Sequence, residues 1–176
     1  MRITMAQTDV TLGDVDSNLK TVERVVGEAV EADSDLIVFP ELALSGYQVG
    51  QVSHDLSLAP DDRRLLRISQ RAGGAGVLLG YPEAGGHGLH TYNSAGYYED
   101  GRLVHVHRKL YLPTYSSFEE RKHFLPGQQS RAGWADGVDG VDRVERSERA
   151  RLTARCLIAP GGPCARRGSR RTLRRG

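Results

Sequence analysis

The sequence has few cysteines and no long apolar segment. Its two cysteines, Cys156 and Cys164, lie close together near the end of the 176 residues, which implies no disulfide framework. Their spacing also differs from that of structural zinc sites, and no histidine follows Cys164. No stretch is apolar over the length that a bilayer requires, and the first residues lack the apolar region of a secretory signal. We therefore expect a cytoplasmic protein with no membrane partner.

Lysine, tyrosine and phenylalanine are absent after Phe124, where arginine becomes the main basic residue. Residues 1–130 carry 12 basic and 17 acidic side chains, a net charge of −5, whereas residues 131–176 carry 12 basic and 5 acidic ones, a net charge of +7. Residues 137–148 repeat in near-triplets that have neither helical nor strand period. Such a pattern is typical of a GC-rich coding sequence read in a shifted frame. The alternative is a true arginine-rich tail for nucleic acid or acidic surfaces, although Trp134 is its one aromatic residue for stacking on bases.

The first 40 residues predict a strand, a helix and a second strand. Residues 2–10 alternate as a strand with Ile3 and Met5 facing inward. Asp16 or Ser17 caps a helix with one apolar stripe, formed by Leu19, Val22, Val25, Val26 and Ala29. The apolar run 36–39 then reads as a buried strand that Pro40 stops. Together these segments predict a right-handed βαβ unit and an α/β fold.

The following residues predict a helix, a strand and a hairpin. Residues 60–62, Pro-Asp-Asp, favour a helix start, and residues 77–81 read as a buried strand that Pro82 breaks. Residues 92–98 and 103–107 flank a turn whose Asp-Gly supplies positive φ angles. Two histidines in the second hairpin strand, His105 and His107, share one face; they leave open a metal pair or an ordinary solvent-facing pair.

Glu41 directly follows the apolar run 36–39, and open α/β sheets place their chemistry at the carboxyl ends of strands. A carboxylate in that position is poorly solvated unless another group pairs with it. The alternative is an ordinary solvated loop acid. A second segment, residues 108–127, favours the functional interpretation.

Residues 36–47 and 108–127 together resemble the nitrilase superfamily of carbon–nitrogen hydrolases. The first contains strand-Pro-Glu…Gly-Tyr, and the second contains Lys-x-x-Leu-Pro, then Phe-x-Glu, then Phe-x-Pro-Gly. The resemblance covers the chain from the first strand to Gly127. It implies the family's four-layer α-β-β-α sandwich, of which residues 1–127 supply the N-terminal half, so that the fold is truncated and residues 128–176 form an irregular or frameshifted tail.

The resemblance also implies roles for three residues. Glu41 is the general base and later the acid, Lys109 stabilises the tetrahedral intermediate, and Glu120 holds Lys109 and the substrate. Glu120 fits the motif better than Glu119, because the family's glutamate lies two residues after one phenylalanine and four before another. A lysine flanked by two carboxylates stays charged in a dry pocket, where its field on an oxyanion is strongest.

The family's nucleophile, a cysteine followed closely by aspartate, has no good match. Cys156 lies in a short apolar run after a basic residue that lowers a thiol's pKa, so it is the better candidate. Cys164 lies between glycine- and arginine-rich residues. We expect that the chain is catalytically incomplete as written.

The resulting hypothesis is a hydrolase of small amides, carbamoyl compounds or nitriles. It needs no cofactor and no metal, and family members are usually homo-oligomers. The alternative is a basic-tailed nucleic-acid-binding or interaction protein on a hydrolase-like scaffold.

Overall fold

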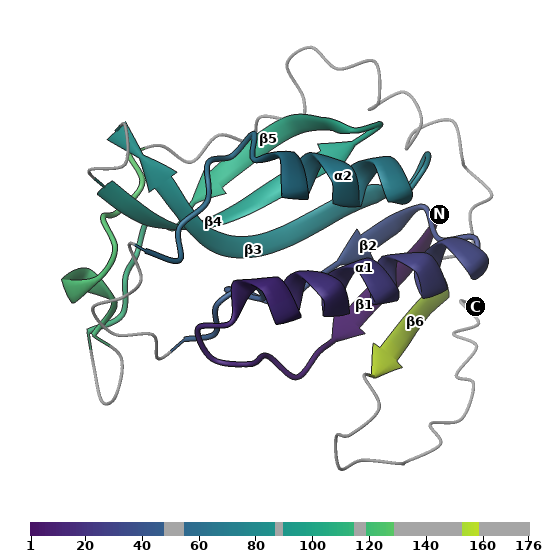
Figure 1. The fold of residues 1–176 in the computed structure, drawn as a ribbon, viewed down its shortest axis with the longest axis horizontal. Helices are drawn as coiled ribbons and strands as arrows, with labels where there is room; N and C mark the ends of the chain where they lie inside the picture. Colours follow the sequence, from purple (N-terminus) through teal and green to yellow (C-terminus); the bar gives the residue numbers. More distant parts are fainter. Residues whose placement is uncertain (48–54, 87–89, 115–118, 129–152, 159–176) are drawn as a thin grey trace, which may run out of the picture.

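The computed structural model describes residues 1–47, 55–86, 90–114, 119–128 and 153–158, the last range by its backbone alone. This part of the chain forms one sheet, two α-helices and a short 3-10 helix (Figure 1). The elements are β1 (Arg2–Gln7), α1 (Val15–Glu31), β2 (Leu36–Val38), α2 (Arg63–Arg71), β3 (Gly76–Gly85), β4 (His90–Glu99), β5 (Arg102–Arg108), η3 (Glu120–Lys122) and β6 (Thr153–Ile158).

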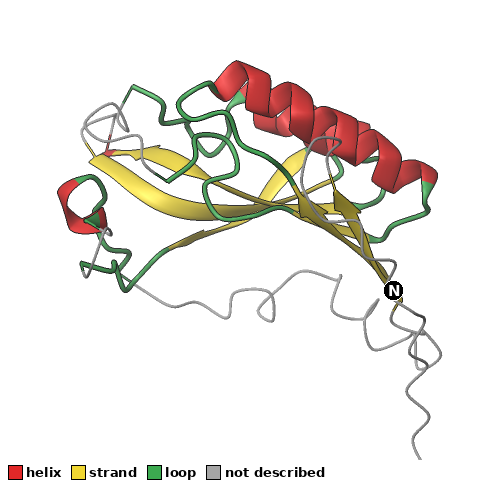
Figure 2. Ribbon diagram, turned by 90° about the horizontal axis from the view of Figure 1, so that it is seen from below, coloured by secondary structure: helices red, strands yellow, loops and turns green. Residues whose placement is uncertain are grey.

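The six strands lie in the order β5-β4-β3-β2-β1-β6. β6, β1, β2 and β3 are parallel neighbours, whereas β3, β4 and β5 form an antiparallel meander. Both α-helices cover the same face of the sheet, as the edge-on view shows (Figure 2). The predicted α/β class is confirmed, with one sheet and one helix layer in the described residues. None of the helices in these residues is long and apolar enough to cross a bilayer.

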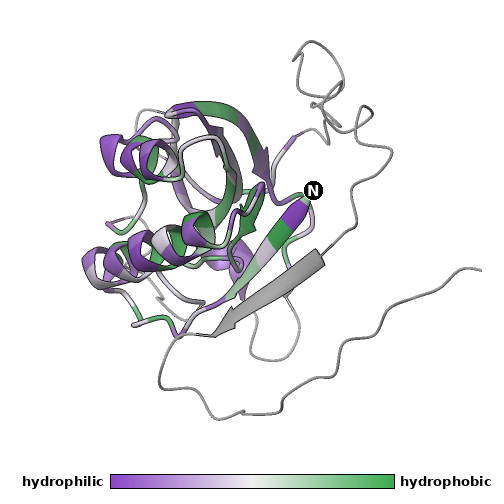
Figure 3. Cartoon of the chain, turned by 90° about the vertical axis from the view of Figure 1, so that its right-hand side faces the viewer, coloured by the Kyte–Doolittle hydropathy of each residue, from purple (hydrophilic) through white to green (hydrophobic). Residues whose placement is uncertain are grey.

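The predicted βαβ unit is present as β1, α1 and β2. All five residues of the predicted stripe are buried, and the outer face of α1 is hydrophilic (Figure 3). The helix begins earlier than predicted, however. Its N-cap is Asp14, whose carboxylate accepts a hydrogen bond of 3.0 Å from the backbone N–H of Ser17, so the prediction of Asp16 or Ser17 as the cap is wrong.

The predicted inward face of β1 is also wrong. Met5 is 54% exposed, whereas Thr4 and Ala6 lie buried beneath the helices. These small side chains let a helix approach the sheet, and the Thr4 hydroxyl is satisfied by the Ser34 hydroxyl at 2.7 Å. Alternation then places Ile3 and Met5 on the face without helices.

The helix predicted after Pro60 is α2, with Asp62 as its N-cap and Leu65 and Ile68 buried. β3, however, continues through Pro82 to Gly85, so the predicted strand break is wrong. The carbonyl of Pro82 accepts a hydrogen bond from Leu58 on the side where β2 has already ended. A strand residue's N–H and C=O point to the same side, so the missing proline donor interrupts no ladder there.

The predicted hairpin is β4 and β5, and its turn contains two residues with positive φ, Asp100 at 51° and Gly101 at 72°. The ladder shifts register between Tyr97 and Tyr98. β5 ends at Arg108, so Lys109 follows directly at the end of the sheet that also carries the loop after β2.

The main core lies between the helices and the sheet. A second, small apolar cluster contains Leu42, Leu112 and Phe124. It lies outside the main core and joins segments that are far apart in the sequence.

Candidate active site

Glu41 begins the turn that follows β2, and the close approach of β3 fixes its backbone. A Cβ placed on Gly80 would lie 2.5 Å from the carbonyl oxygen of Pro40 and 2.7 Å from the Cα of Glu41. Only glycine therefore lets the two segments pass at this separation. The segment is thus held against the middle of the sheet.

Both carboxylate oxygens of Glu41 accept hydrogen bonds. Oε1 accepts from the side-chain amide of Asn93 at 2.6 Å and from Nζ of Lys109 at 2.8 Å, and Oε2 accepts from the hydroxyl of Tyr47. Three donors on one carboxylate favour its ionised form.

Lys109 bridges the two glutamates predicted for the site. Its Nζ lies 2.8 Å from Glu41 and 2.9 Å from Oε1 of Glu120. Its backbone is also fixed, because its N–H donates to Asn93 O at 2.8 Å and its C=O accepts from Gly127 at 2.9 Å. The structure thus brings the three predicted polar residues together.

Glu120 is the first residue of η3 and is 6% exposed. Its second carboxylate oxygen, Oε2, is buried and has no hydrogen-bond partner among the described residues. A buried acceptor without a partner is costly, so this oxygen is available to a donor from a bound molecule.

The surroundings favour the charged forms of Glu41 and Lys109. Burial alone would raise the pKa of Glu41, but the hydrogen bonds from Lys109, Tyr47 and Asn93 outweigh it and hold the pKa below its ordinary value. Burial would likewise lower the pKa of Lys109, but hydrogen bonds and charge attraction from Glu41 and Glu120 raise it overall. At neutral pH the site therefore holds a carboxylate and an ammonium in contact.

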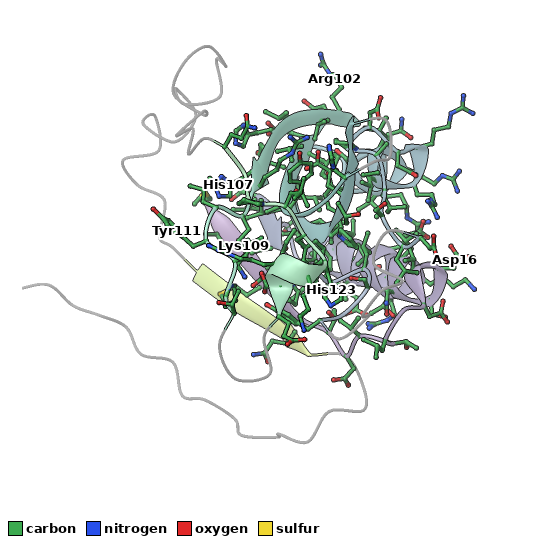
Figure 4. The ribbon with its side chains drawn as sticks, turned by 90° about the vertical axis from the view of Figure 1, so that its left-hand side faces the viewer. Asp16, Arg102, His107, Lys109, Tyr111 and His123 are labelled. Carbon is green, nitrogen blue, oxygen red and sulfur yellow. The ribbon has the colours of Figure 1, made fainter. Side chains whose placement is uncertain are left out.

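A pocket of about 530 Å³ opens beside these groups. Its polar side includes Glu41, Asn93 and Lys109, and its other lining residues are Phe39, Pro40, Leu78, Gly80, Ser94, Ala95, His107, Leu110 and Tyr111. His107, Lys109 and Tyr111 lie on the same side of the molecule, away from Asp16 at the start of α1 (Figure 4). The pocket is large enough for a small organic amide, with one charged end and largely apolar walls.

Sequence reasoning did not identify Asn93 and Tyr47 as site residues. Tyr47 lies inside the Gly-Tyr part of the motif, and Asn93 lies in a strand with a polar face. Tyr47 contacts Glu41 from six residues further along the same motif, so its place in the Gly-Tyr pair was an available signal. Asn93 has no local signal for its role, because β4 must align beside β3 before Asn93 reaches Glu41.

The two histidines predicted to share a face, His105 and His107, belong to no metal cluster in the described residues, where no three potential ligands gather.

Cys156 lies on β6, whose backbone pairs with β1 so that Cys156 is opposite Met5. Met5 in turn is opposite Val38, which precedes Glu41 by three residues. The side chain of Cys156, and the whole of Cys164, fall outside the residues that the structure describes.

Comparison with known proteins identifies the family. The model of the carbon-nitrogen hydrolase family matches residues 2–148, which extends beyond the motifs that end at Gly127. The glutamine-dependent NAD(+) synthetase of Thermotoga maritima is 37% identical over 132 residues, which cover 73% of this chain and 22% of that protein.

Two solved structures share the fold. One is a glutamine-dependent NAD+ synthetase from Acinetobacter baumannii (30% identity, TM-score 0.55), matched over 67% of this chain and 22% of that one. The other is an amidase from Nesterenkonia sp. (25% identity, TM-score 0.60), matched over 72% of this chain and 48% of that one. The chain thus spans about a fifth of the synthetases and about half of the amidase. With its nitrilase-type α/β fold, this chain belongs to the carbon–nitrogen hydrolase family.

Proposed function

We propose that residues 1–127 form the substrate-binding part of a carbon–nitrogen hydrolase that acts on a small carboxamide. The observation that carries the proposal is the position of Lys109, whose ammonium contacts both Glu41 and Glu120 beside a pocket. Glutamine is the first substrate to test, because several relatives are named glutamine-dependent NAD(+) synthetases. Simple aliphatic amides come second, because one structural relative is an amidase.

Each group has a role in amide hydrolysis. Glu41 is ionised and accepts a proton from the attacking nucleophile, and it later returns that proton to the leaving nitrogen. The Lys109 ammonium stabilises the oxyanion that forms when the carbonyl carbon becomes tetrahedral. Glu120 keeps Lys109 in place, and its Oε2, which has no partner among the described residues, accepts a hydrogen bond from the substrate's NH₂ group.

The missing part of this scheme is the nucleophile. None of the side chains described around Glu41 and Lys109 is a cysteine. The chain as written is therefore proposed to bind amides without hydrolysing them. Cys156 is the candidate that would change this conclusion.

Two assays on the full chain test the proposal. Saturation-transfer NMR with glutamine and with acetamide is expected to show binding of at least one of these amides, which Lys109→Met abolishes and Lys122→Met, a matched control at an exposed lysine, preserves. Ammonia release from glutamine and acetamide is expected to stay at the uncatalysed level. Absence of binding by both glutamine and acetamide would overturn the substrate class. Ammonia release that Cys156→Ala abolishes and Cys164→Ala spares would instead identify Cys156 as the nucleophile.

The basic-tailed alternative rests on the net charge of +7 in residues 131–176, nearly all of which lie outside the described residues. It predicts binding to DNA or RNA that weakens steeply with salt and disappears when the tail arginines are replaced by glutamine. Equal binding by the wild-type chain and that variant would exclude it.

A further inference from the structure

Leu42, the residue after Glu41, has an unusual backbone conformation. Its φ angle is +48°, in the left-handed region that residues with a branched side chain rarely adopt. Its carbonyl oxygen accepts hydrogen bonds from Ser45 at 3.1 Å and Gly46 at 2.8 Å, which close a tight turn. Non-glycine residues persist in this conformation only where the surrounding structure fixes them, and such residues concentrate at functional sites.

The side chain of Leu42 supplies that fixation. It is fully buried, but its partners are Leu112 and Phe124 rather than the main core. Leu112 lies three residues after Lys109, and Phe124 lies four residues after Glu120. One apolar cluster therefore contains a side chain from each of the three segments that supply Glu41, Lys109 and Glu120.

Backbone hydrogen bonds connect the same segments. Glu120 donates from its N–H to Pro113 O at 3.2 Å, and the carbonyl of Glu120 accepts from Phe124 at 2.8 Å. On the other side of Glu41, β3 passes so close at Gly80 that a Cβ there would lie within 2.7 Å of backbone atoms of Pro40, Glu41 and Leu42. Glu41 is thus confined between a rigid strand and the apolar cluster.

We propose that Leu42 is a positioning residue, which through Leu112 and Phe124 sets the distance between the Glu41 carboxylate and the Lys109 ammonium. This inference rests on the proposed function, since it assigns Leu42 a role in the same site. Leu42 does not line the pocket beside Lys109. It acts by fixing the turn from which Glu41 projects.

The low number of lysines gives a direct test. The chain contains three, Lys20, Lys109 and Lys122. Labelling of lysine with ¹³C and ¹⁵N therefore gives three side-chain signals in the full chain. Lys20→Arg and Lys122→Arg each remove one signal, and the signal that remains in both variants belongs to Lys109. Its chemical shift and pKa report the contacts with Glu41 and Glu120, and among the described residues Tyr47 and Asn93 also donate to Glu41.

Leu42→Ala is expected to move the Lys109 signal toward that of Lys20, which lies on the surface. Leu44→Ala is the matched control, because Leu44 is equally buried but belongs to the main core, so it should lower stability without moving the Lys109 signal. Leu42→Met preserves volume and should restore the wild-type signal. If Leu42→Ala does not fold, Leu112→Ala truncates the same cluster from the opposite side and is expected to give the same shift.

A Lys109 signal unchanged in folded Leu42→Ala or Leu112→Ala would overturn the proposal, as would an equal shift in Leu44→Ala. The result is independent of the acetamide and ammonia assays. Failure of the wild-type chain to bind either glutamine or acetamide overturns the proposed function and leaves the Lys109 signals to decide the role of Leu42.

Discussion

At the scale of single residues, the site depends on one ammonium, that of Lys109, which contacts two carboxylates. Glu120 is almost fully buried, and Lys109 is the cation that contacts it. Lys109 also contacts the more exposed Glu41. Removal of the ammonium therefore affects the two glutamates differently.

Lys109→Met is expected to lower the free energy of unfolding by about 1–3 kcal/mol, because it leaves a buried carboxylate without its donor. It should also raise the pKa of Glu41, since burial then acts with fewer opposing hydrogen bonds. Urea unfolding and a ¹³C titration of the glutamates measure the two effects. An unchanged Glu41 pKa would contradict the described contact.

The same contact predicts a pH window. The pKa of Glu41 lies below its ordinary 4.5 in the folded chain, so its contribution to stability is present above pH 4.5 and is lost as the pH falls through the folded pKa. The pKa of Lys109 lies above 10.5, so its contribution is present below pH 10.5 and is lost as the pH rises further. The stability difference between wild type and Lys109→Met should therefore be largest between these values. A difference independent of pH would contradict the prediction.

Sequence reasoning predicted Glu41, Lys109 and Glu120 as site residues because each matches a family motif with recognisable spacing, and the structure brings the three side chains together. It missed Asn93 because its contact with Glu41 arises only when the loop after β2 and the strand β4 come together. It also missed Tyr47, although Tyr47 lies six residues after Glu41 in the same motif. The role of Gly80 was equally hidden, because a glycine required by close approach looks in the sequence like any other glycine.

At the scale of secondary-structure elements, a buried ion pair between strands should contribute more to the free energy of unfolding than an exposed one. Arg108 on β5 donates from two nitrogens to Glu83 on β3, and Ser94 on β4 donates to the same carboxylate at 2.6 Å. The ring of Tyr92 lies 4.0 Å from the Arg108 guanidinium carbon. Glu83 is fully buried, so this ion pair connects three strands beside the site.

Arg108→Ala is expected to destabilise the chain by about 3 kcal/mol or more, because it leaves the buried Glu83 carboxylate uncompensated. Arg64→Ala is the matched control: Arg64 pairs with Asp62 at the surface, where such a pair contributes about 0–1 kcal/mol. Denaturant unfolding compares the two. Similar losses would mean that Glu83 is solvated and that the strand contact is not as described.

Substitution of Gly80 or Gly27 by alanine is expected to change the stability of the chain in opposite directions. Gly80→Ala should cost about 1–3 kcal/mol, because its Cβ would meet backbone atoms of Pro40, Glu41 and Leu42 that have no room to move. Gly27→Ala, in the middle of α1 with open space around it, should instead stabilise by about 0.5–1 kcal/mol. Thermal unfolding measures both changes in stability. If Gly80→Ala left the stability unchanged, the close approach of β3 to Glu41 would be contradicted.

The helical spacing of apolar residues predicted the buried face of α1 correctly, because that one face packs against the sheet. The orientation of β1 was not predictable in the same way. Its apolar residues at positions 3 and 5 favoured an inward face, but the helix side of the sheet accommodates the smaller Thr4 and Ala6. Hydrophobic alternation alone does not specify which face a helix will cover when both faces are partly apolar.

At the scale of the whole molecule, the face of the sheet without α-helices carries apolar side chains. Met5, Val38 and Leu78 form one row across three strands, and Met5 is 54% exposed. Exposed apolar sheet surface favours association. The full chain is therefore expected to self-associate as its concentration rises.

Met5→Lys should reduce this association, measured by light scattering, because it places a charge on the open face. Val30→Lys is the control, since Val30 is an exposed apolar residue on α1. An equal reduction by both variants would assign the effect to net charge rather than to the open face.

The tail poses the remaining question at this scale. Translation of the coding DNA in all three frames from the codon of Phe124 is expected to reveal, in another frame, a strand followed by a cysteine and an aspartate. Absence of such a continuation would contradict the frameshift hypothesis and favour the basic-tailed alternative.

The ammonium of Lys109 is shared by Glu41 and Glu120, and the proposed site depends on this sharing. The most direct test is a pH titration of the labelled Lys109 side chain in the wild-type chain and in the double variant Glu41→Gln/Glu120→Gln. We predict a pKa above 10.5 in the wild type and below 10.5 in the double variant, because burial then acts without the carboxylates. A wild-type Lys109 that titrates at 10.5 and does not respond to the double substitution would contradict the account.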